Sequence, residues 1–180
     1  MIYTFLADGF EEIEALCPVD IMRRAGLSVT TVGIGKKEIV GSHGITVSAD
    51  ISDENIEFEA IDLIFLPGGM PGAKNLDESE SVQKAIDLAT EQNAYIAAIC
   101  AAPMILGKRG LLNGKNAVCY PSFEKYLFGA TVPKNARLVT DGKIITAKGM
   151  GVALDLGLEI VKLLCADGKA DELRKAVIAD

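Results

Sequence analysis

The sequence predicts an α/β protein with a doubly wound, mainly parallel sheet and helices on both faces. Three observations support this prediction. Short apolar runs, partly β-branched and closed by Gly, Pro, Asp or Asn, are typical of buried strands. Helix-like segments lie between most of these runs, and parallel crossovers need connections of that size. The length of 180 residues, with 49% hydrophobic residues, suits a single domain over 1–180 with a substantial core.

Strands and helices alternate through the first part of the chain. The segment 11–24 carries apolar residues at helical spacing and ends before Gly26, and Pro18 is expected to bend it. A second helix is predicted over 78–91, which begins with acidic residues and carries Val82 on its apolar face. The predicted strands are, in chain order, 2–7, 27–34, 61–66, 95–99 and 116–119.

The later part departs from simple alternation. Two apolar pieces around Asp141-Gly142 predict a hairpin, because Asp-Gly favours the turn type that matches strand twist. The segment 45–49 is a candidate for an additional short strand. The two arms of the hairpin are expected at 137–139 and 144–147, and two further helices at 151–164 and 169–178.

Charge and composition exclude several classes of function. With 18 basic and 25 acidic residues the net charge is −7, which argues against a nucleic-acid partner. No segment has the length of a membrane span, and the start of the chain does not have the pattern of a signal peptide. The four cysteines form no C-x-x-C pair and there is only one histidine, so we expect no metal site and no cofactor. Reduced thiols in the cytoplasm are the expectation.

The loops that follow the strands hold the candidate functional residues. In an open parallel sheet, ligands bind beyond the carboxyl ends of the strands, near the point where the strand order reverses. The loops in question are 8–14, 67–69, 100–103 and 120–121. We therefore expect these four loops to meet in one crevice.

Cys100 is the strongest candidate for a reactive residue. It directly follows a predicted strand, Pro103 suits the first turn of a helix, and the small Ala101 allows a tight connection. At such a nucleophile elbow the sulfur would lie near the positive end of a helix, which favours the thiolate. The alternative is a buried structural cysteine, the more common fate of a free thiol.

Four further residues near Cys100 in the predicted crevice are candidates: Gly68, Gly69, Ala101 and Glu14. Backbone N–H groups of Gly68 and Gly69, together with the N–H of Ala101, could stabilise a developing oxyanion, although Pro-Gly-Gly is more often only a turn. Glu14, if buried, would favour its protonated form and could donate a hydrogen bond to the Cys100 thiolate. An ordinary solvated glutamate is the alternative. The single histidine, His43, is expected at the surface or an interface.

The chain resembles the ThiJ/PfpI superfamily, specifically the branch that contains the parkinsonism-associated deglycase and its bacterial relatives. The likeness spans nearly the full length, and the motifs are specific as an ordered set. They are Asp8-Gly-Phe-Glu-Glu-Ile-Glu14, Pro18-Val-Asp-Ile-Met-Arg-Arg-Ala-Gly26, Leu66-Pro-Gly-Gly-Met-Pro-Gly-Ala73, Asn75-Leu76 and Ala97-Ala-Ile-Cys-Ala-Ala-Pro103.

The resemblance implies a flavodoxin-like fold, of the kind seen in class I glutamine amidotransferases, and a homodimer. It also implies a reactive cysteine at Cys100 and a hydrogen-bonding glutamate at Glu14. The activities attributed to the family are glyoxalase and deglycase chemistry on methylglyoxal or its adducts, sensing by cysteine oxidation, and chaperone-like behaviour.

The chain departs from the family pattern at one important position. Many relatives have a histidine in the loop over 118–122, where Tyr120 stands here. A Cys-His dyad needs an imidazole, so peptide hydrolysis is not expected. Tyr120 could donate a hydrogen bond to a bound carbonyl oxygen, but a phenol is ordinarily a poor general base at neutral pH. The dimer-spanning arginine of some relatives is also replaced, near His43.

The leading hypothesis is therefore a cofactor-independent enzyme that acts on a small reactive carbonyl through Cys100. The alternative is a non-enzymatic oxidative-stress sensor, or a chaperone-like protein, that relies on oxidation of the same cysteine.

Overall fold

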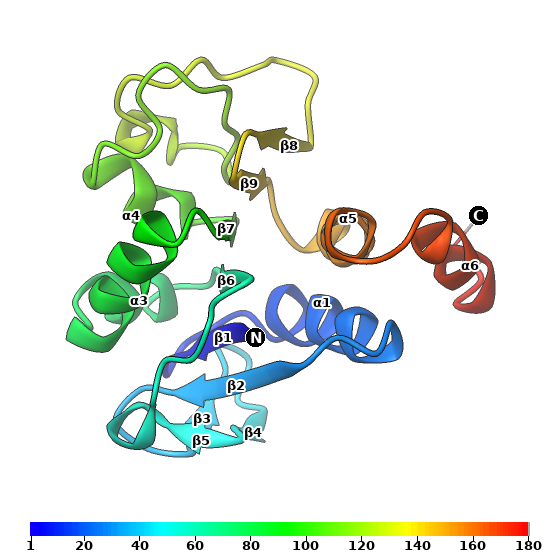
Figure 1. Ribbon diagram of the computed structural model, residues 1–180. Coiled ribbons are helices and arrows are strands. Elements are labelled where there is room, and N and C mark those ends of the chain that lie inside the picture. The colour runs from blue at the N-terminus through cyan, green and yellow to red at the C-terminus, as the bar shows by residue number, and fades with distance from the viewer. Residues whose placement is uncertain (180) are drawn as a thin grey trace.

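A seven-stranded sheet runs through the middle of the protein, in the order β5-β2-β1-β6-β7-β9-β8. The computed structural model describes residues 1–179 (Figure 1). Every neighbouring pair of strands is parallel except β8 and β9. The strands are β1 (Ile2–Leu6), β2 (Val29–Gly33), β5 (Ile51–Ser52), β6 (Leu63–Leu66), β7 (Tyr95–Ile99), β8 (Leu138–Asp141) and β9 (Ile144–Ala147).

Helices cover both faces of this sheet, which confirms the predicted fold class (Figure 1). On one side α1 packs against α5, and on the other side lie α3 and α4. The short α2 precedes α3, and α6 packs on the outside of α5. The helices are α1 (Glu12–Arg24), α2 (Gly72–Asp77), α3 (Glu80–Glu91), α4 (Pro103–Lys108), α5 (Ala153–Leu164) and α6 (Lys169–Ala176).

The two sides of the sheet form two separate cores, because successive side chains of a strand point to opposite faces. In β6, Leu63 and Phe65 pack with α1 and α5, whereas Ile64 and Leu66 pack with α3 and α4. All four side chains are fully buried. This two-sided burial explains why the strands are apolar throughout and could be recognised as short runs in the sequence.

The predicted hairpin is confirmed, since β8 and β9 pair antiparallel around Gly142, whose φ is +62°. The candidate strand over 45–49 is also present, as β4 (Thr46–Ser48). It pairs with β3 (Glu38–Val40), which was not predicted, in a separate two-stranded sheet. Pro18 lies inside α1, which continues past it to its end at Arg24. Short 3-10 turns occur at Asp53–Asn55, Glu124–Tyr126 and Met150–Val152.

The predicted strand over 116–119 is wrong. Strand β9 occupies the position beside β7, so this segment has no strand to pair with and forms only one isolated bridge, from Asn116 to Thr131. Its backbone finds other partners: the Val118 N–H donates to the side-chain oxygen of Thr146 at 3.0 Å. The segment resembles a strand in sequence because its burial makes it equally apolar.

Replacing Thr146 with valine is expected to lower the free energy of unfolding by about 1–3 kcal/mol, because the buried Val118 N–H would lose its only acceptor at nearly unchanged side-chain volume. Urea unfolding would measure the effect. Thr140→Val on the edge strand β8 serves as the control, since the Thr140 hydroxyl is only half buried and bonds the Glu159 carboxylate. Equal losses in both variants would contradict the assigned role of Thr146.

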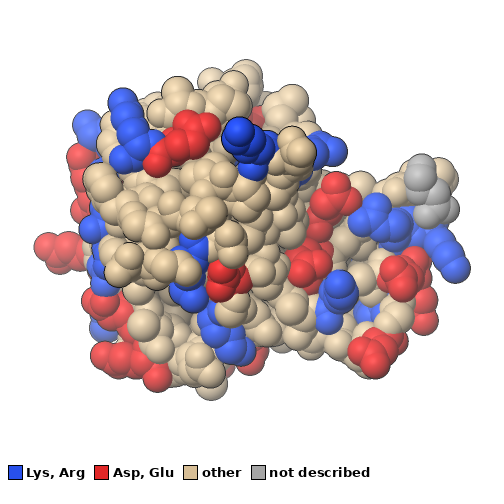
Figure 2. Space-filling model, turned by 90° about the horizontal axis from the view of Figure 1, so that it is seen from above, with Lys and Arg blue, Asp and Glu red and all other residues tan. Residues whose placement is uncertain are grey.

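The surface carries acidic and basic side chains close together, and α6 projects from the body on the right of the view from above (Figure 2). None of the helices within residues 1–179 has both the length and the apolar character needed to cross a membrane.

Candidate functional site

The strand order reverses between β1 and β6, and the loops predicted to meet do so at the carboxyl ends of these strands. The Glu11 N–H, after β1, donates to the Gly68 carbonyl, after β6, at 2.9 Å. The Tyr120 N–H donates to the carbonyl of Cys100, after β7, at 2.8 Å. These bonds join the loops in two pairs, and Gly68 packs against the Cys100 side chain, so the four loops meet in one crevice.

Cys100 occupies a sharp turn between β7 and α4. Its φ is +63°, in the left-handed region that side chains other than glycine rarely adopt. The turn is held from both sides, because the Cys100 N–H donates to the Ala147 carbonyl at 2.9 Å and its carbonyl accepts from Tyr120. Strained residues of this kind cluster at active sites. The residue is half buried.

Glu14 lies in the first turn of α1 and is only 2% exposed. The carboxylate of Glu11 caps the helix by accepting the Glu14 N–H at 2.7 Å. Among residues 1–179, Oε2 of Glu14 has no hydrogen-bond partner although it is buried. A Cβ placed on Gly68 would stand 2.5 Å from Cβ of Cys100 and still closer to this Oε2. The Glu14 and Cys100 side chains are therefore neighbours.

Burial governs the protonation of this pair. It raises the pKa of Glu14 to about 7, and the charge of Glu11 adds to the effect while Cys100 opposes it. Burial, followed by the negative charge of Glu14, raises the pKa of the Cys100 thiol to about 12. Backbone N–H groups of Gly69 and Ala101 act in the opposite direction on the thiol. When Glu14 is protonated its charge no longer opposes the thiolate, so the two groups titrate as a unit.

Glu14→Gln is expected to change how the alkylation rate of Cys100 depends on pH. In the wild type the coupled pair predicts two rises in rate, near pH 7 and near pH 12, because the first proton leaves the pair as a whole. Glutamine does not titrate and carries no charge, so the variant should show one rise, at a pH below 12. Iodoacetamide labelling followed by intact mass would measure both profiles.

The matched control is Glu91→Gln, at the exposed end of α3, which should keep the two-step profile. A two-step profile in Glu14→Gln, or one superimposable on that of the wild type, would show that the carboxyl and the thiol are not coupled.

Glycine is needed at positions 68 and 69 because neighbouring atoms of the site lie too close to leave room for a side chain. At Gly68 the neighbours are the Glu14 and Cys100 side chains. Gly69 has a φ of +88°, and a Cβ there would collide with the backbone of the loop over 8–14. The Gly69 and Ala101 N–H groups lie near the sulfur, where they lower the pKa of the thiol.

Tyr120 lies beside the site and is about half exposed, at 51%. A Cβ built on Gly149 would be 3.5 Å from the Tyr120 ring and 3.5 Å from Oε1 of Glu14. The loop after β9, with Gly149 and Met150, therefore completes the site. The sequence did not reveal this loop, because a strand over 116–119 beside β7 would leave no place there for the end of β9.

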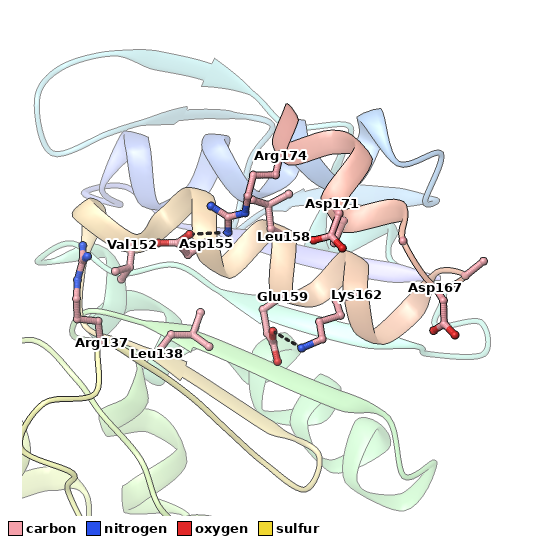
Figure 3. A pocket seen from close by; sticks show the side chains of 13 residues that line it. Arg137, Leu138, Val152, Asp155, Leu158, Glu159, Lys162, Asp167, Asp171 and Arg174 are labelled. Atoms are coloured by element: carbon pink, nitrogen blue, oxygen red, sulfur yellow. Dashed lines mark hydrogen bonds and ion pairs between the residues drawn. The ribbon is translucent and has the colours of Figure 1, made fainter. Parts of the chain in front are cut away.

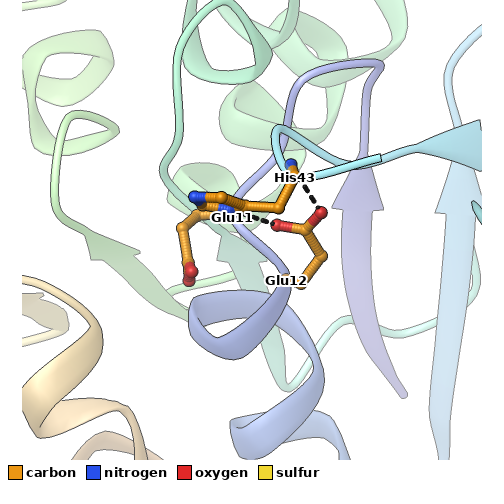
Figure 4. A group of neighbouring side chains, drawn as sticks. All are labelled: Glu11, Glu12 and His43. Carbon is orange, nitrogen blue, oxygen red and sulfur yellow. Dashed lines mark hydrogen bonds and ion pairs between the residues drawn. The ribbon is translucent and has the colours of Figure 1, made fainter. Parts of the chain in front are cut away.

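Glu11, Glu12 and His43 form a second cluster near the entrance (Figure 4). One possible metal-ligand atom from each lies within 4.8 Å of the others. The Glu12 carboxylate, however, already accepts hydrogen bonds from the His43 backbone N–H at 2.8 Å and from Nδ1 at 2.9 Å. Burial opposes ionisation of Glu12, but the hydrogen bonds from His43 outweigh it and lower the pKa to about 2. The cluster is thus a hydrogen-bonded Glu-His pair, with His43 at the surface as predicted.

A cavity of about 600 Å³ lies away from the Cys100 site, between β8, α5 and α6 (Figure 3). Its walls carry charges of both signs that partly pair with one another. Arg174 pairs with Asp155 at 2.9 Å, and Lys162 lies 4.0 Å from Glu159. The cavity contains none of the candidate site residues.

Comparison with known proteins identifies relatives that cover nearly the whole chain. The chain is 34% identical over 175 residues to protein dj-1beta of Drosophila melanogaster, covering 96% of this chain and 94% of that protein. It is 28% identical over 165 residues to the glutathione-independent glyoxalase DJR-1.2 of Caenorhabditis elegans, covering 92% and 88%. Protein DJ-1 homolog B of Arabidopsis thaliana is 35% identical over 170 residues, which cover 93% of this chain and 39% of that protein.

Among solved structures, oxidized DJ-1 of Toxoplasma gondii superposes with a TM-score of 0.91 at 31% identity, covering 98% of this chain and 97% of that one. Residues 1–163 match the model of the DJ-1/PfpI family. The turn at Cys100, the glycines at 68–69 and the buried Glu14 thus stand in a chain that belongs to the DJ-1/PfpI family.

Proposed function

We propose that this protein is a cysteine-dependent, cofactor-independent enzyme of the glyoxalase and deglycase type that acts on methylglyoxal or its adducts in the cytoplasm. The observation that carries the proposal is the strained, half-buried Cys100 beside a buried carboxyl whose pKa is raised to about 7. A similar protein, DJR-1.2, is named a glutathione-independent glyoxalase. Such chemistry needs a thiolate and a group that can both accept and return a proton near neutral pH.

The reaction would proceed in three steps. The pKa of the Cys100 thiol is raised to about 12, so the thiol first passes its proton to the Glu14 carboxylate as the sulfur adds to the aldehyde carbon of methylglyoxal. Glu14 returns this proton to the carbonyl oxygen, which gives a hemithioacetal. Glu14 then removes the proton from this carbon and returns it to the adjacent carbon through an enediol, which leaves a lactyl thioester. Water hydrolyses the thioester and releases lactate and the free thiol. The overall change is the addition of one water, with no external oxidant or reductant.

Backbone donors would stabilise the charge that develops on oxygen in these steps. The Gly69 and Ala101 N–H groups lie near the sulfur, and rigid donors of this kind are effective in a partly buried site. In deglycation the hemithioacetal would form from an aminocarbinol adduct with loss of the amine, and the same thioester would follow. Because Tyr120 occupies the loop in place of a histidine, the proposal does not extend to peptide hydrolysis.

The test is formation of lactate from methylglyoxal in the absence of glutathione. We expect the product to accumulate in proportion to enzyme concentration, with substrate loss and lactate gain equal. Loss of methylglyoxal without lactate would mean that the protein is only modified by the substrate, and the enzymatic proposal would fail.

Oxidation of Cys100 is the second candidate function. The similar DJ-1 structure from Toxoplasma gondii is that of an oxidized protein, and the half-buried sulfur here has backbone donors beside it. Sulfinic acid formation would add two oxygens from peroxide at the thiolate. Mild peroxide followed by peptide mass analysis should place this addition on Cys100. Equal oxidation at the half-buried Cys17 and Cys165 would count against a sensing role.

We also propose that the protein forms a homodimer through the surface around His43. Three large apolar side chains are about half exposed there, namely Ile13 at 49%, Ile45 at 56% and Met150 at 54%. They border a hollow of about 240 Å³. Burial of such side chains against a second copy would contribute roughly 1.5–3 kcal/mol each.

Ile45→Glu is expected to convert the dimer into a monomer in sedimentation velocity, because it places a charge in this apolar surface. Ile178→Glu, at a residue that is 90% exposed, is the control and should remain dimeric. A monomeric wild type would refute the proposal directly.

A further inference from the structure

A cavity of about 300 Å³ adjoins the crevice that holds Cys100. Tyr120, Gly149 and Met150 form the wall that it shares with the site. The connection is close, since a Cβ on Gly149 would lie 3.5 Å from both Glu14 Oε1 and the Tyr120 ring. A substrate bound at Cys100 could therefore extend its remote end into this cavity.

The cavity is positively charged although the protein as a whole is acidic. Lys148 and Arg137 are the charged residues of its lining, and no carboxylate lines it. Within residues 1–179, neither of them forms an ion pair. In a chain of net charge −7, two unpaired cations in one cavity beside the nucleophile are an uncommon arrangement.

The fold places the backbones of these two residues side by side. They lie where the hairpin ends, and the Lys148 N–H donates to the Arg137 carbonyl at 2.9 Å. The guanidinium of Arg137 donates to the Gly151 carbonyl at 2.6 Å, which ties it to the loop after β9. Lys148 is half buried. Burial and the charge of Glu124 raise the pKa of the Cys119 thiol, and the positive charge of Lys148 partly opposes this increase. Glu124 does not line the cavity.

We propose that Lys148 and Arg137 select carbonyl substrates that carry an anionic group, a carboxylate or a phosphate, at the end remote from the aldehyde. The inference rests on the proposed function and adds a preference for anionic 2-oxoaldehydes over neutral ones such as methylglyoxal. The aldehyde would lie at Cys100, a short methylene spacer would pass the Tyr120 ring and Val152, and the anion would meet the two cations. Lys148 is half buried and Arg137 is exposed. A hydrogen bond from a half-buried charged group commonly gives a tenfold to hundredfold preference.

The first test does not depend on catalysis, because it compares two alkylating agents that differ in charge. Iodoacetate carries a carboxylate and iodoacetamide does not, so the ratio of their rates at Cys100 reports the local field. Lys148→Met keeps the side-chain length and removes the charge. We expect this variant to lower the iodoacetate-to-iodoacetamide ratio about tenfold, and added salt to reduce the ratio in the wild type.

Lys84→Met is the matched control. Lys84 is exposed on α3, across the sheet from the cavity, and its Nζ lies 5.8 Å from the centre of the Phe58 ring. This variant should retain the wild-type ratio. An unchanged ratio in Lys148→Met, or the same loss in both variants, would overturn the proposal.

The second test uses turnover. The substrates are 4,5-dioxopentanoate, which has a terminal carboxylate, the phosphate ester of hydroxypyruvaldehyde, and the neutral 2-oxopentanal. Lys148→Met should lower kcat/KM for the anionic substrates about tenfold relative to 2-oxopentanal, mainly through KM. A larger loss for the phosphate would assign phosphate as the preferred anion, and a larger loss for 4,5-dioxopentanoate would assign carboxylate.

The two tests separate the two proposals. If the wild type turns over neither methylglyoxal nor any of these substrates, the enzymatic function fails while the alkylation ratio still decides whether the cavity attracts anions. If it turns over all of them with a ratio that Lys148→Met leaves unchanged, the enzymatic function stands and the anion-selective cavity fails.

Discussion

Cys100→Ser is expected to lower kcat/KM for lactate formation from methylglyoxal by roughly a thousandfold or more, the scale of effect seen when a nucleophile is removed. The hydroxyl fits the space of the thiol, so the turn at φ +63° and its bonds to Ala147 and Tyr120 should remain. A serine hydroxyl is a weak nucleophile near neutral pH, and Glu14 would be its only neighbouring carboxyl base. The loss should therefore lie in the chemical step rather than in the fold.

Cys165→Ser is the matched control, because Cys165 follows α5, is half buried and lies outside the crevice. It should retain activity within about twofold. Circular dichroism and the urea midpoint would verify that both variants are folded. Equal rates in Cys100→Ser and the wild type would eliminate a mechanism through Cys100. Strong loss in Cys165→Ser at unchanged stability would show that another thiol contributes.

Gly68→Ala is expected to reduce activity at least about a hundredfold and to lower the free energy of unfolding by roughly 1–3 kcal/mol. The added methyl group would collide with three neighbours: Glu14 Oε2, Cys100 Cβ at 2.5 Å and the Ile99 carbonyl oxygen at 2.9 Å. To avoid this collision, either the Glu14 carboxyl or the Cys100 turn would have to move. A displacement of about 1 Å between reacting groups is enough for a loss of this size.

Gly110→Ala provides the contrast. A Cβ at Gly110 meets no atom within 4 Å, although its φ of +73° makes the substitution mildly strained. We expect it to cost about 1 kcal/mol of stability and to leave kcat per folded molecule unchanged. Lactate assays at temperatures well below the unfolding midpoint would separate the two effects. Full activity in Gly68→Ala would show that this glycine does not hold Glu14 and Cys100 together.

Local chemistry in the sequence was sufficient to predict much of the fold and the sharp turn at Cys100. A tight strand-to-helix turn needs small residues and a helix-starting proline within a few positions of Cys100, so the motif is visible without the rest of the chain. The same holds for the hairpin at Gly142 and for the strands that are buried on both faces. In each case neighbours in sequence impose the conformation.

The wrong prediction of a strand over 116–119 shows what local sequence patterns do not determine. Apolar residues indicate burial, but whether a buried segment joins the sheet depends on which strand already lies beside β7, and that pairing is between distant parts of the chain. Because β9 occupies the place, its carboxyl end brings Gly149 to the crevice and Lys148 to the neighbouring cavity. Sequence proximity to the other site residues could not have revealed these two positions.

Glu14 shows most clearly which properties of the site follow from the sequence and which follow only from the tertiary structure. The sequence by itself determined an α/β fold, a cysteine at an elbow and a carboxyl one helical turn into the first helix. Only the tertiary structure decided that this carboxyl is buried beside Cys100 with a pKa raised to about 7, and that two unpaired cations line the adjoining cavity. The physical reason is that local backbone preferences act over a few residues, whereas desolvation and charge depend on every segment that packs around a group.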